Sequence, residues 1–429
     1  MRRLPCLPAL LLVALLVSTG RSHAFCPDGW VMLNTPYAYS HDQFHWLYVN
    51  PGGSMACYDY AAATWLDFPA DLDGWVFFDW PHGFALNTGR WYYFNAADNL
   101  LCYNMCSTDW TLFGARRYSN ADAWGTWLIS EIMVEATTQD ILTGWVGVTA
   151  INAFSGYTYD GAGTEDDIQG FAFVDNVGVA DIDITAMPDP QPLDVDAWKS
   201  HAVCAHTGGG GSYAYMYAIV RRGDAYSNTD LPGTWVLSQV SASGTGNSLT
   251  TGPVVVDGAL NFTAYFSDKL GNPDIVTGTC SVNTYGTTTV VPDGMGAMLF
   301  DMSATKDVLL SAWMEGATAN FGVMVKRAAT YTMADAVGTW RYSLIDIGST
   351  TQQTERGTIC IYSDGTGTMR TVDWDGDTHT DSGPISVAAD GLVTLGSRQL
   401  QLNASHSVMT GCWVDGSSVM LVFCVRNLE

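Results

Sequence analysis

The segment Tyr226–Trp235, YSNTDLPGTW, is one of three gapless copies in this chain; the others are Tyr118–Trp127 (YSNADAWGTW) and Tyr331–Trp340 (YTMADAVGTW). The closing tryptophan recurs at intervals of 108 and 105 residues, from Trp127 to Trp235 and on to Trp340. A segment that returns at a nearly fixed period indicates tandem copies of one structural unit. We therefore predict three similar domains of about 100 residues each.

Each copy also ends in the same way. An apolar run leads into basic residues at Tyr217–Arg222 (YAIVRR), Phe321–Arg327 (FGVMVKR) and Leu421–Arg426 (LVFCVR). The starts and ends together divide the second part of the chain into units of residues 118–223, 224–328 and 329–429.

Within these units the sequence reads as short strands and tight turns. Strand-like runs lead into Asp-Gly pairs at residues 364–365, 390–391 and 415–416. Asp-Gly pairs are typical of hairpins, because type I′ turns need positive φ angles. Helical periodicity is not convincing anywhere after residue 25. Seven or eight strands per unit predict an all-β chain of tandem small meander β-barrels.

The turn that enters the first strand carries a family resemblance. Asp-x-x-Gly-Thr-Trp before the first strand, with a basic residue leaving the last strand, resembles the lipocalin and avidin (calycin) superfamily over about 300 residues. In that family the tryptophan plugs one barrel end, and the basic side chain packs across its ring in a cation–π contact. The resemblance implies a structural motif of Trp127 with Arg221 or Arg222, Trp235 with Lys326 or Arg327, and Trp340 with Arg426.

Residues 25–117 contain a second repeat, with a period of 45 residues. The sequence DGWV at 28–31 recurs at 73–76, and Cys57-Tyr58 recurs at Cys102-Tyr103. We expect an aromatic-rich β domain of two hairpin-rich halves. The sequence WYYFN at 91–95 resembles the hairpins of secreted cell-wall-binding and glucan-binding repeats, which implies that aromatic faces contact sugars or choline.

The shorter repeat also suggests a different fold. Blades of 40–50 residues build β-propellers, and the chain is long enough for about eight of them. The wider spacing of the Gly-Thr-Trp segments favours whole domains, and the propeller stays open as the alternative.

Residues 1–24 have the pattern of a signal peptide. Arg2 and Arg3 precede an apolar run at 4–17, and Ser22-His23-Ala24 supplies small residues for cleavage before Phe25. No later window holds the roughly 18 uninterrupted apolar residues that a membrane helix needs. We expect a soluble, secreted or periplasmic protein without a membrane span after cleavage.

Composition restricts the partners and the redox state. The chain has 18 Lys and Arg against 43 Asp and Glu, a formal net charge of −25, which argues against nucleic acid as a partner. Nine cysteines follow residue 24. In an oxidising compartment we expect disulfides, and the odd number leaves at least one thiol free or paired between chains.

Two groups of residues have the side chains of transition-metal ligands. His41 and His45 could share a zinc ion only on a helix, and the second copy of the repeat has a turn there. His201, Cys204 and His206 are closely spaced, but His201 and His206 stand where the later units have strand packing residues. We favour turn and strand residues in both places, with a metal site as the alternative.

Calcium is the one cofactor that the sequence suggests. Asp373, Asp375, Asp377 and Asp381 surround Gly376, and alternating oxygen ligands suit Ca²⁺. The order of an EF-hand loop is not kept, and a solvated hairpin turn is the other interpretation. Residues 165–167 form a second acidic loop of the same kind.

Aromatic residues of the 45-residue repeat are the candidate ligand-binding residues. Trp46 and Tyr48 share one face of a strand, as do Trp91 and Tyr93, because side chains alternate along a strand. That face is either the core of the small domain or a platform on which sugar rings stack.

Hydrolase signatures are missing from the sequence. It has no Gly-x-Ser-x-Gly elbow and no Walker loop. We expect a non-catalytic binding or structural protein of the cell surface or extracellular space, with a glycan or another surface component as its partner. The alternatives are a carrier of small hydrophobic ligands inside the barrels, which requires an apolar cavity, and a secreted hydrolase with an unrecognised carboxylate site.

Overall fold

The computed structural model describes short strands between His23 and Phe113, with the turn residue Leu86, and then most of residues 122–427. From residue 122 onward its description leaves out 136–137, 151, 175–178, 185–190, 197–198, 209–212, 245, 349–351 and 374. The chain divides into two compact units, residues 1–117 and 118–428.

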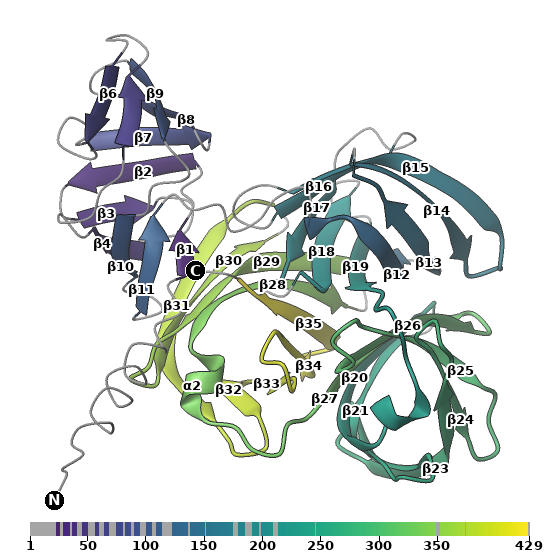
Figure 1. The fold of residues 1–429 in the computed structure, drawn as a ribbon. Coiled ribbons are helices and arrows are strands. Elements are labelled where there is room, and N and C mark those ends of the chain that lie inside the picture. The colour runs from purple at the N-terminus through teal and green to yellow at the C-terminus, as the bar shows by residue number, and fades with distance from the viewer. Residues whose placement is uncertain are drawn as a thin grey trace, which may run out of the picture. The chain divides into compact units, whose positions relative to one another are not determined.

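The second unit consists of three closed antiparallel barrels of eight strands each (Figure 1). Neighbouring strands around each barrel follow one another in the chain, and the last strand pairs with the first. This order confirms the prediction of tandem small meander β-barrels. Residues 122–427 do not form the blades of a β-propeller.

Equivalent strands of the three barrels have similar lengths. Barrel 1 contains β12 (Gly125–Glu135), β13 (Gln139–Val148), β14 (Ala153–Asp160), β15 (Glu165–Val174), β16 (Val179–Ile184), β17 (Gln191–Val195), β18 (His201–Gly208) and β19 (Tyr213–Arg221). Barrel 2 contains β20 (Gly233–Ser243), β21 (Gly246–Val256), β22 (Asn261–Asp268), β23 (Pro273–Val282), β24 (Thr287–Pro292), β25 (Met298–Met302), β26 (Val308–Glu315) and β27 (Thr318–Lys326). Barrel 3 contains β28 (Gly338–Ile347), β29 (Gln352–Ile361), β30 (Thr366–Asp373), β31 (Thr378–Val387), β32 (Leu392–Leu395), β33 (Arg398–Leu402), β34 (Val408–Asp415) and β35 (Ser418–Arg426).

Asp-Gly turns join strands where the sequence predicts them. Gly365, Gly391 and Gly416 have φ angles of 81°, 85° and 59°. These angles lie in the left-handed region that glycine adopts without steric cost. Each turn connects consecutive strands of barrel 3.

The first and last strands of each barrel meet at a tryptophan and a basic residue. The strand register pairs Trp127 with Arg221, Trp235 with Lys326 and Trp340 with Arg426. The charged groups lie over the indole rings at 5.9, 5.3 and 5.5 Å from the ring centroids, respectively. Contacts of this length are within the range of cation–π attraction.

Short capped turns before the first strands fix the orientation of these indoles. A single 3₁₀ turn, η2 (Asn228–Asp230), precedes β20, and a short helix, α2 (Met333–Ala336), precedes β28. The indole N–H of Trp235 donates to the Leu231 carbonyl at 2.8 Å, and that of Trp340 donates to the Ala336 carbonyl at the same distance. Both indoles are fully buried with their one donor satisfied.

The three barrels pack on one another in a cyclic order. The last two strands of one barrel lie against the first two strands of another, which places β18–β19 against β28–β29, β26–β27 against β12–β13, and β34–β35 against β20–β21. Because the same head-to-tail contact occurs three times, it closes into a ring with approximate three-fold symmetry. Outward-facing residues of all three barrels, including Val203, Phe321 and Phe423, form one shared apolar core.

A buried polar network also joins the barrels, at three equivalent turns before β18, β26 and β34. The Asp307 carboxylate accepts hydrogen bonds from the Asn403 amide at 3.0 Å and the Ser405 backbone N–H at 2.8 Å. Thr305 lies between this carboxylate, at 2.5 Å, and His201, at 3.5 Å. Because these bonds satisfy buried polar groups only in one arrangement, they fix how the barrels fit together.

The described residues of the first unit form a sheet of eleven strands with internal two-fold character. The order is β1-β11-β10-β4-β3-β2-β7-β8-β9-β5-β6. Val31 on β2 pairs with Val76 on β7, the equivalent residue of the second 45-residue half, and both are buried. The outer hairpins are exchanged, since β10 pairs with β4 and β5 pairs with β9. The strands of this sheet are β1 (His23–Phe25), β2 (Gly29–Asn34), β3 (Tyr37–Ser40), β4 (His45–Val49), β5 (Ala56–Asp59), β6 (Thr64–Asp67), β7 (Gly74–Asp79), β8 (His82–Ala85), β9 (Arg90–Phe94), β10 (Leu100–Asn104) and β11 (Asp109–Phe113).

The segment expected to be a signal peptide lies mostly outside the described residues. His23, Ala24 and Phe25 form β1, which pairs in parallel with β11, so the cleavage position predicted before Phe25 falls within this strand. Of the helices in the part of the chain that the structure describes, none combines the length and the hydrophobicity that a membrane crossing needs.

Replacing Trp235 with alanine tests the closure of barrel 2. We expect Trp235→Ala to lower the free energy of unfolding by about 3–5 kcal/mol, because it empties a fully buried site beneath Lys326. Trp145→Ala is the matched control, because this side chain is 40% exposed, and it should cost less than about 1 kcal/mol. Urea unfolding of both variants measures the difference, and equal small losses would contradict the role of Trp235.

Candidate functional site

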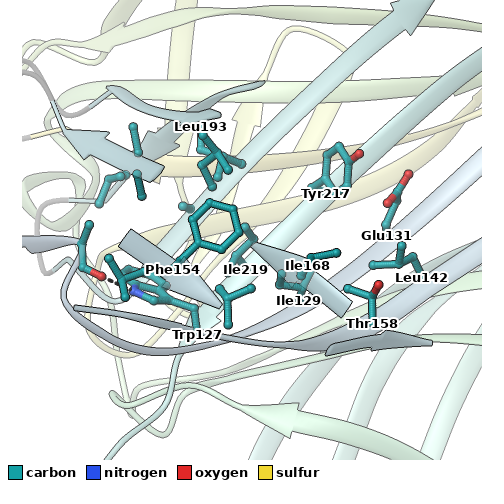
Figure 2. A pocket seen from close by; sticks show the side chains of 18 of the residues that line it. Trp127, Ile129, Glu131, Leu142, Phe154, Thr158, Ile168, Leu193, Tyr217 and Ile219 are labelled. Atoms are coloured by element: carbon teal, nitrogen blue, oxygen red, sulfur yellow. Dashed lines mark hydrogen bonds between the residues drawn. The ribbon is translucent and has the colours of Figure 1, made fainter. Parts of the chain in front are cut away.

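Barrel 1 contains a cavity of about 460 Å³. Its walls are mainly apolar, and Figure 2 shows Trp127 and Phe154 at one end of the lining and Glu131, Leu142 and Thr158 toward the other. This volume lies in the range of about 300–1,000 Å³ that is typical of sites for small molecules. The interior of barrel 1 is therefore a candidate binding site.

Smaller side chains explain why barrel 1 is hollow. Strand registers and the equivalent turns before β18, β26 and β34 align inward positions of the three barrels. Ala202 stands where barrel 2 has Leu309 and barrel 3 has Met409, and all three are buried. Three further positions of barrel 1 carry smaller residues than barrel 2 does: Thr158 for Phe266, Val195 for Met302 and Leu193 for Phe300.

The rim of barrel 1 also differs from those of the other two barrels. Trp313 packs into the interior of barrel 2 and Trp413 into that of barrel 3. The equivalent residue of barrel 1 is His206, which is exposed and lies 5.2 Å from the Tyr215 ring. Barrel 1 therefore lacks a tryptophan at the position from which Trp313 and Trp413 enter the other two interiors.

One buried acidic side chain lies in the cavity wall. Glu131 is only 8% exposed, and burial raises the pKa of its carboxyl to about 8. A hydrogen bond with Tyr217 lowers this pKa, whereas the nearby Asp140 raises it. Burial also raises the pKa of the Tyr217 hydroxyl. At neutral pH the carboxyl is therefore mostly protonated and can both donate and accept hydrogen bonds.

The cavity reaches the surface beside two acidic residues. Asp166 and Asp167 line it and are exposed. The sequence predicted that residues 165–167 form an acidic loop, which is wrong, because they begin β15 and pair with β14. The strong β propensity of the neighbouring sequence overrides the preference of acidic residues for turns. Among the described residues that line the cavity, none is basic.

The predicted ligand group of His201, Cys204 and His206 does not converge on one point. All three lie on β18, where side chains alternate between the two faces. His201 is fully buried outside barrel 1, with its Nδ1 3.1 Å from Asp196 Oδ2. Cys204 belongs instead to the interior cluster of barrel 1. These positions match the interpretation as strand residues.

Four cysteines of the barrels are buried or half-buried thiols that add no reactive group. Cys204, Cys280, Cys412 and Cys424 are free thiols. Burial raises the pKa of Cys204 to about 12 and that of Cys280 and Cys412 to about 11. Such thiols stay protonated at neutral pH and behave as small apolar residues.

The aspartates proposed as calcium ligands lie around the hairpin between β30 and β31. Asp373 ends β30 and its Oδ2 lies 3.1 Å from His379 Nε2, while Asp375 Oδ1 accepts from the Asp377 N–H at 3.3 Å. Asp381 lies further along β31, opposite Met369. Among the described residues, no three acidic, histidine or cysteine side chains are grouped so that they could hold a metal ion. Calcium binding stays a prediction.

Asp373 takes part in a different arrangement, inside the end of barrel 3. It pairs across the sheet with Glu355, and each carboxylate has one buried oxygen without a hydrogen-bond partner. Burial raises the pKa of Glu355, Arg398 lowers it, and Asp346 and Asp373 raise it further. Arg398 itself lies over the Trp413 ring at 5.8 Å. The Arg398 guanidinium thus offsets part of the repulsion between the carboxylates of Glu355 and Asp373.

Trp91 is the one residue of the predicted aromatic platform whose side chain lies within the described residues. Trp91, on β9, is 47% exposed, and its ring centroid lies 5.3 Å from that of Phe84. Tyr48 and Tyr93 are equivalent positions on β4 and β9, where the register pairs them with Tyr103 and Tyr58. The side chains of Trp46, Tyr48 and Tyr93 lie outside the described residues, as does His41. His45 begins β4.

Glu131, Thr158 and Tyr217 of the barrel 1 cavity were not identified as site residues from the sequence. Glu131 follows Trp127 and Ile129 at inward positions of one strand, so a polar residue there breaks the apolar alternation. The equivalent residues are Gln239 in barrel 2 and Leu344 in barrel 3. This contrast between copies is the signal that could have located the site.

Comparisons with known proteins do not assign a family. No family model matches the chain, and no curated protein matches it. A solved structure of transferrin binding protein B from Haemophilus parasuis is 7% identical, with a TM-score of 0.25, and covers 87% of this chain and 85% of its own. The Neisseria meningitidis protein of the same name is 9% identical, with a TM-score of 0.23, covering 77% and 84%. A DUF3598 family protein of unknown function from Nostoc punctiforme is 9% identical, with a TM-score of 0.19, covering 71% and 97%. At these values the likeness assigns neither a family nor a ligand.

The raised pKa of Glu131 predicts how stability depends on pH. The folded state holds this proton up to about pH 8, whereas an unfolded glutamate loses it near 4.5. Between these values folding binds a proton, so stability falls by up to about 1.4 kcal/mol per pH unit as the pH rises. Glu131→Gln removes this contribution and should gain stability relative to the natural protein from pH 5 to pH 8.

Urea unfolding at pH 5, 6, 7 and 8 measures this difference. Glu315→Gln is the control, because Glu315 is exposed at the end of β26. It should shift stability by the same amount at every pH. A constant difference for Glu131→Gln as well would show that the Glu131 pKa is not raised.

Proposed function

We propose that this chain is a non-catalytic binding protein and that barrel 1 carries a small, mainly apolar ligand. The observation that supports the proposal is the cavity of about 460 Å³ with its apolar walls. Of the roles expected from the sequence, the carrier is the one that requires such a cavity. The polar end at Glu131 and Tyr217 would orient the ligand, since a few polar groups in an apolar site give it direction.

The contrast between barrels supports assigning this role to barrel 1. Large residues such as Phe300, Met302 and Leu309 pack together in the interior of barrel 2. Tyr342, Met369 and Met409 do the same in barrel 3. Barrels 2 and 3 would then serve as a scaffold, joined to barrel 1 through the shared core.

The proposal also includes a secreted or periplasmic location and the absence of catalytic activity. The secreted or periplasmic location rests on the apolar segment at residues 4–17. The hydrolase alternative would need a carboxylate pair such as Glu355 and Asp373, which lie opposite each other in barrel 3. Membership of the calycin superfamily would agree with the eight-stranded barrels and with the tryptophan under a basic residue.

Filling the cavity tests the carrier role. Thr158→Phe and Ala202→Leu each introduce the residue that barrel 2 carries at the equivalent position. We expect either variant to weaken the binding of an apolar fluorescent probe at least tenfold, because the added atoms occupy the space of the ligand. A titration of probe fluorescence in the full chain measures the change.

The control for this test keeps the cavity and changes barrel 2 instead. Leu309→Ala removes a buried side chain from that barrel and should leave binding of the probe unchanged. Near-ultraviolet circular dichroism checks that each variant is folded. Probe binding that survives in the filled variants would contradict the carrier role of barrel 1.

Glycan binding by the first unit is the second candidate function. The observation in its favour is Trp91, which is 47% exposed while its ring packs beside Phe84. A large exposed aromatic face is what a sugar ring stacks on. The resemblance of residues 91–95 to glucan-binding hairpins would agree with this role.

Replacing Trp91 separates binding from folding. Trp91→Ala should abolish retention on an immobilised glycan while urea unfolding stays within about 1 kcal/mol of the natural protein, because the side chain is largely exposed. Trp145→Ala removes an aromatic residue of similar exposure from barrel 1 and should keep retention. A glycan array supplies the ligand, and unchanged retention of the Trp91 variant would contradict the role of that face.

A further inference from the structure

The polar end of the barrel 1 cavity holds a buried carboxyl group without a cation. Glu131 is 8% exposed, and the part of the cavity lining that the structure describes includes no lysine, arginine or histidine. Ionising a buried carboxyl without a cationic partner is costly, so burial favours the protonated form of this group. The site therefore lacks the positive charge that an ionised Glu131 would need.

Three aspartates near Glu131 add to the negative potential at this end of the cavity. Asp140 on β13 raises the pKa of Glu131, and the hydroxyl of Tyr217 on β19 forms a hydrogen bond with it. Asp166 and Asp167 on β15 line the cavity at the surface. On β18, Cys204 has a raised pKa partly because Glu131 is near. Arg356 of barrel 3 lowers the pKa of this thiol, but Arg356 does not line the cavity.

We propose that the ligand of barrel 1 has a protonated amine on an apolar body and that the amine pairs with Glu131. This inference rests on the proposed carrier function, because it requires that the cavity hold a ligand. The ammonium group would lie between Glu131, the Thr158 hydroxyl and the Tyr217 ring, whose electron-rich face attracts cations. The apolar body would extend past Ile129 toward Phe154 and Trp127.

Other head groups fit this end of the cavity less well. A ligand carboxylate would pass Asp166 and Asp167 at the surface and then lie beside Glu131 with no cation to offset its own buried charge. An alcohol could form a hydrogen bond with protonated Glu131 but would not offset an ionised carboxylate. An ammonium group does both, because it donates hydrogen bonds and carries the missing charge.

The release of the Glu131 proton on ligand binding predicts how the affinity depends on pH. When an ammonium ligand pairs with protonated Glu131, the carboxyl proton is released to solvent and the ligand keeps its own proton. Affinity therefore rises with pH, by up to tenfold per unit, until the free carboxyl ionises at about pH 8. It falls again above the pKa of the amine, which is about 10 for an alkylamine.

Three ligands with the same chain and different head groups test the inference. Calorimetric titration of the full chain with decylamine, decanol and decanoate, each at pH 6, 7 and 8, compares them directly. We expect decylamine to bind at least tenfold more tightly than decanol at pH 8, with decanoate the weakest. The advantage of the amine should shrink at pH 6, where Glu131 holds its proton more strongly.

Two Glu→Gln variants test whether the preference for the amine and its pH dependence come from the Glu131 carboxyl. Glu131→Gln keeps the size of the side chain and cannot ionise, so it should reduce decylamine to the affinity of decanol and remove the pH dependence. Glu315→Gln changes an exposed acid of barrel 2 and should keep both. Ala202→Leu fills the cavity and should weaken all three ligands together. Near-ultraviolet circular dichroism confirms that each variant folds.

The outcomes distinguish the two proposals. If decanol or decanoate binds as tightly as decylamine and the affinity ignores pH, the amine inference is overturned while the carrier function stands. If Glu131→Gln keeps the preference for decylamine, Glu131 is not the amine partner and the inference is overturned. If none of the three ligands binds, both proposals fail.

Discussion

The pairing of the first strand with the last in each barrel is the constraint on which the rest of the structure depends. A sheet of eight strands that did not close would leave two edges with unpaired backbone groups. Closure places Trp235 beneath Lys326, and the equivalent pairs in the other barrels in the same way. The outward faces of the same strands supply Val240 and Phe321 to the core that the barrels share. Strand pairing within a barrel therefore also forms the surface through which the barrels pack.

The sequence predicts those features that are repeated and local. The Gly-Thr-Trp segment marks the start of each barrel, and the basic residue marks its last strand. The number of barrels and their closure could therefore be predicted without a structure. The hollow interior of barrel 1 could not, because it depends on which side of each strand a residue faces, and a register change of one residue reverses that face. Ala202 and Thr158 are ordinary residues until the register aligns them with Leu309 and Phe266. Similarly, residues 165–167 resemble a loop in the sequence. They form a strand by pairing with β14, and the local sequence does not show which residues pair with each other.

The arrangement of the three barrels rests on apolar packing for stability and on polar contacts for orientation. Apolar surfaces tolerate small rotations, because the hydrophobic effect has no direction. The hydrogen bonds of Asp307 with Asn403 and Ser405 do not, since each fails outside a narrow geometry. At the outer edge of the ring, Arg341 of barrel 3 also pairs with Asp194 of barrel 1 at 2.7 Å. These contacts select one packing among the many that the apolar surfaces alone would permit.

A ring of repeated barrels explains how one member can remain hollow. An isolated small barrel is stabilised mainly by the side chains inside it, so removing them creates a cavity that costs stability. Barrel 1 has a second apolar face, because Ile132, Val203 and Met216 point outward and are fully buried in the shared core. This outer packing offsets what the interior lacks and holds β12, β18 and β19 in place around the cavity. The filled barrels 2 and 3 thus supply stability to barrel 1, whereas a single barrel of this size would have to provide that stability from its own core.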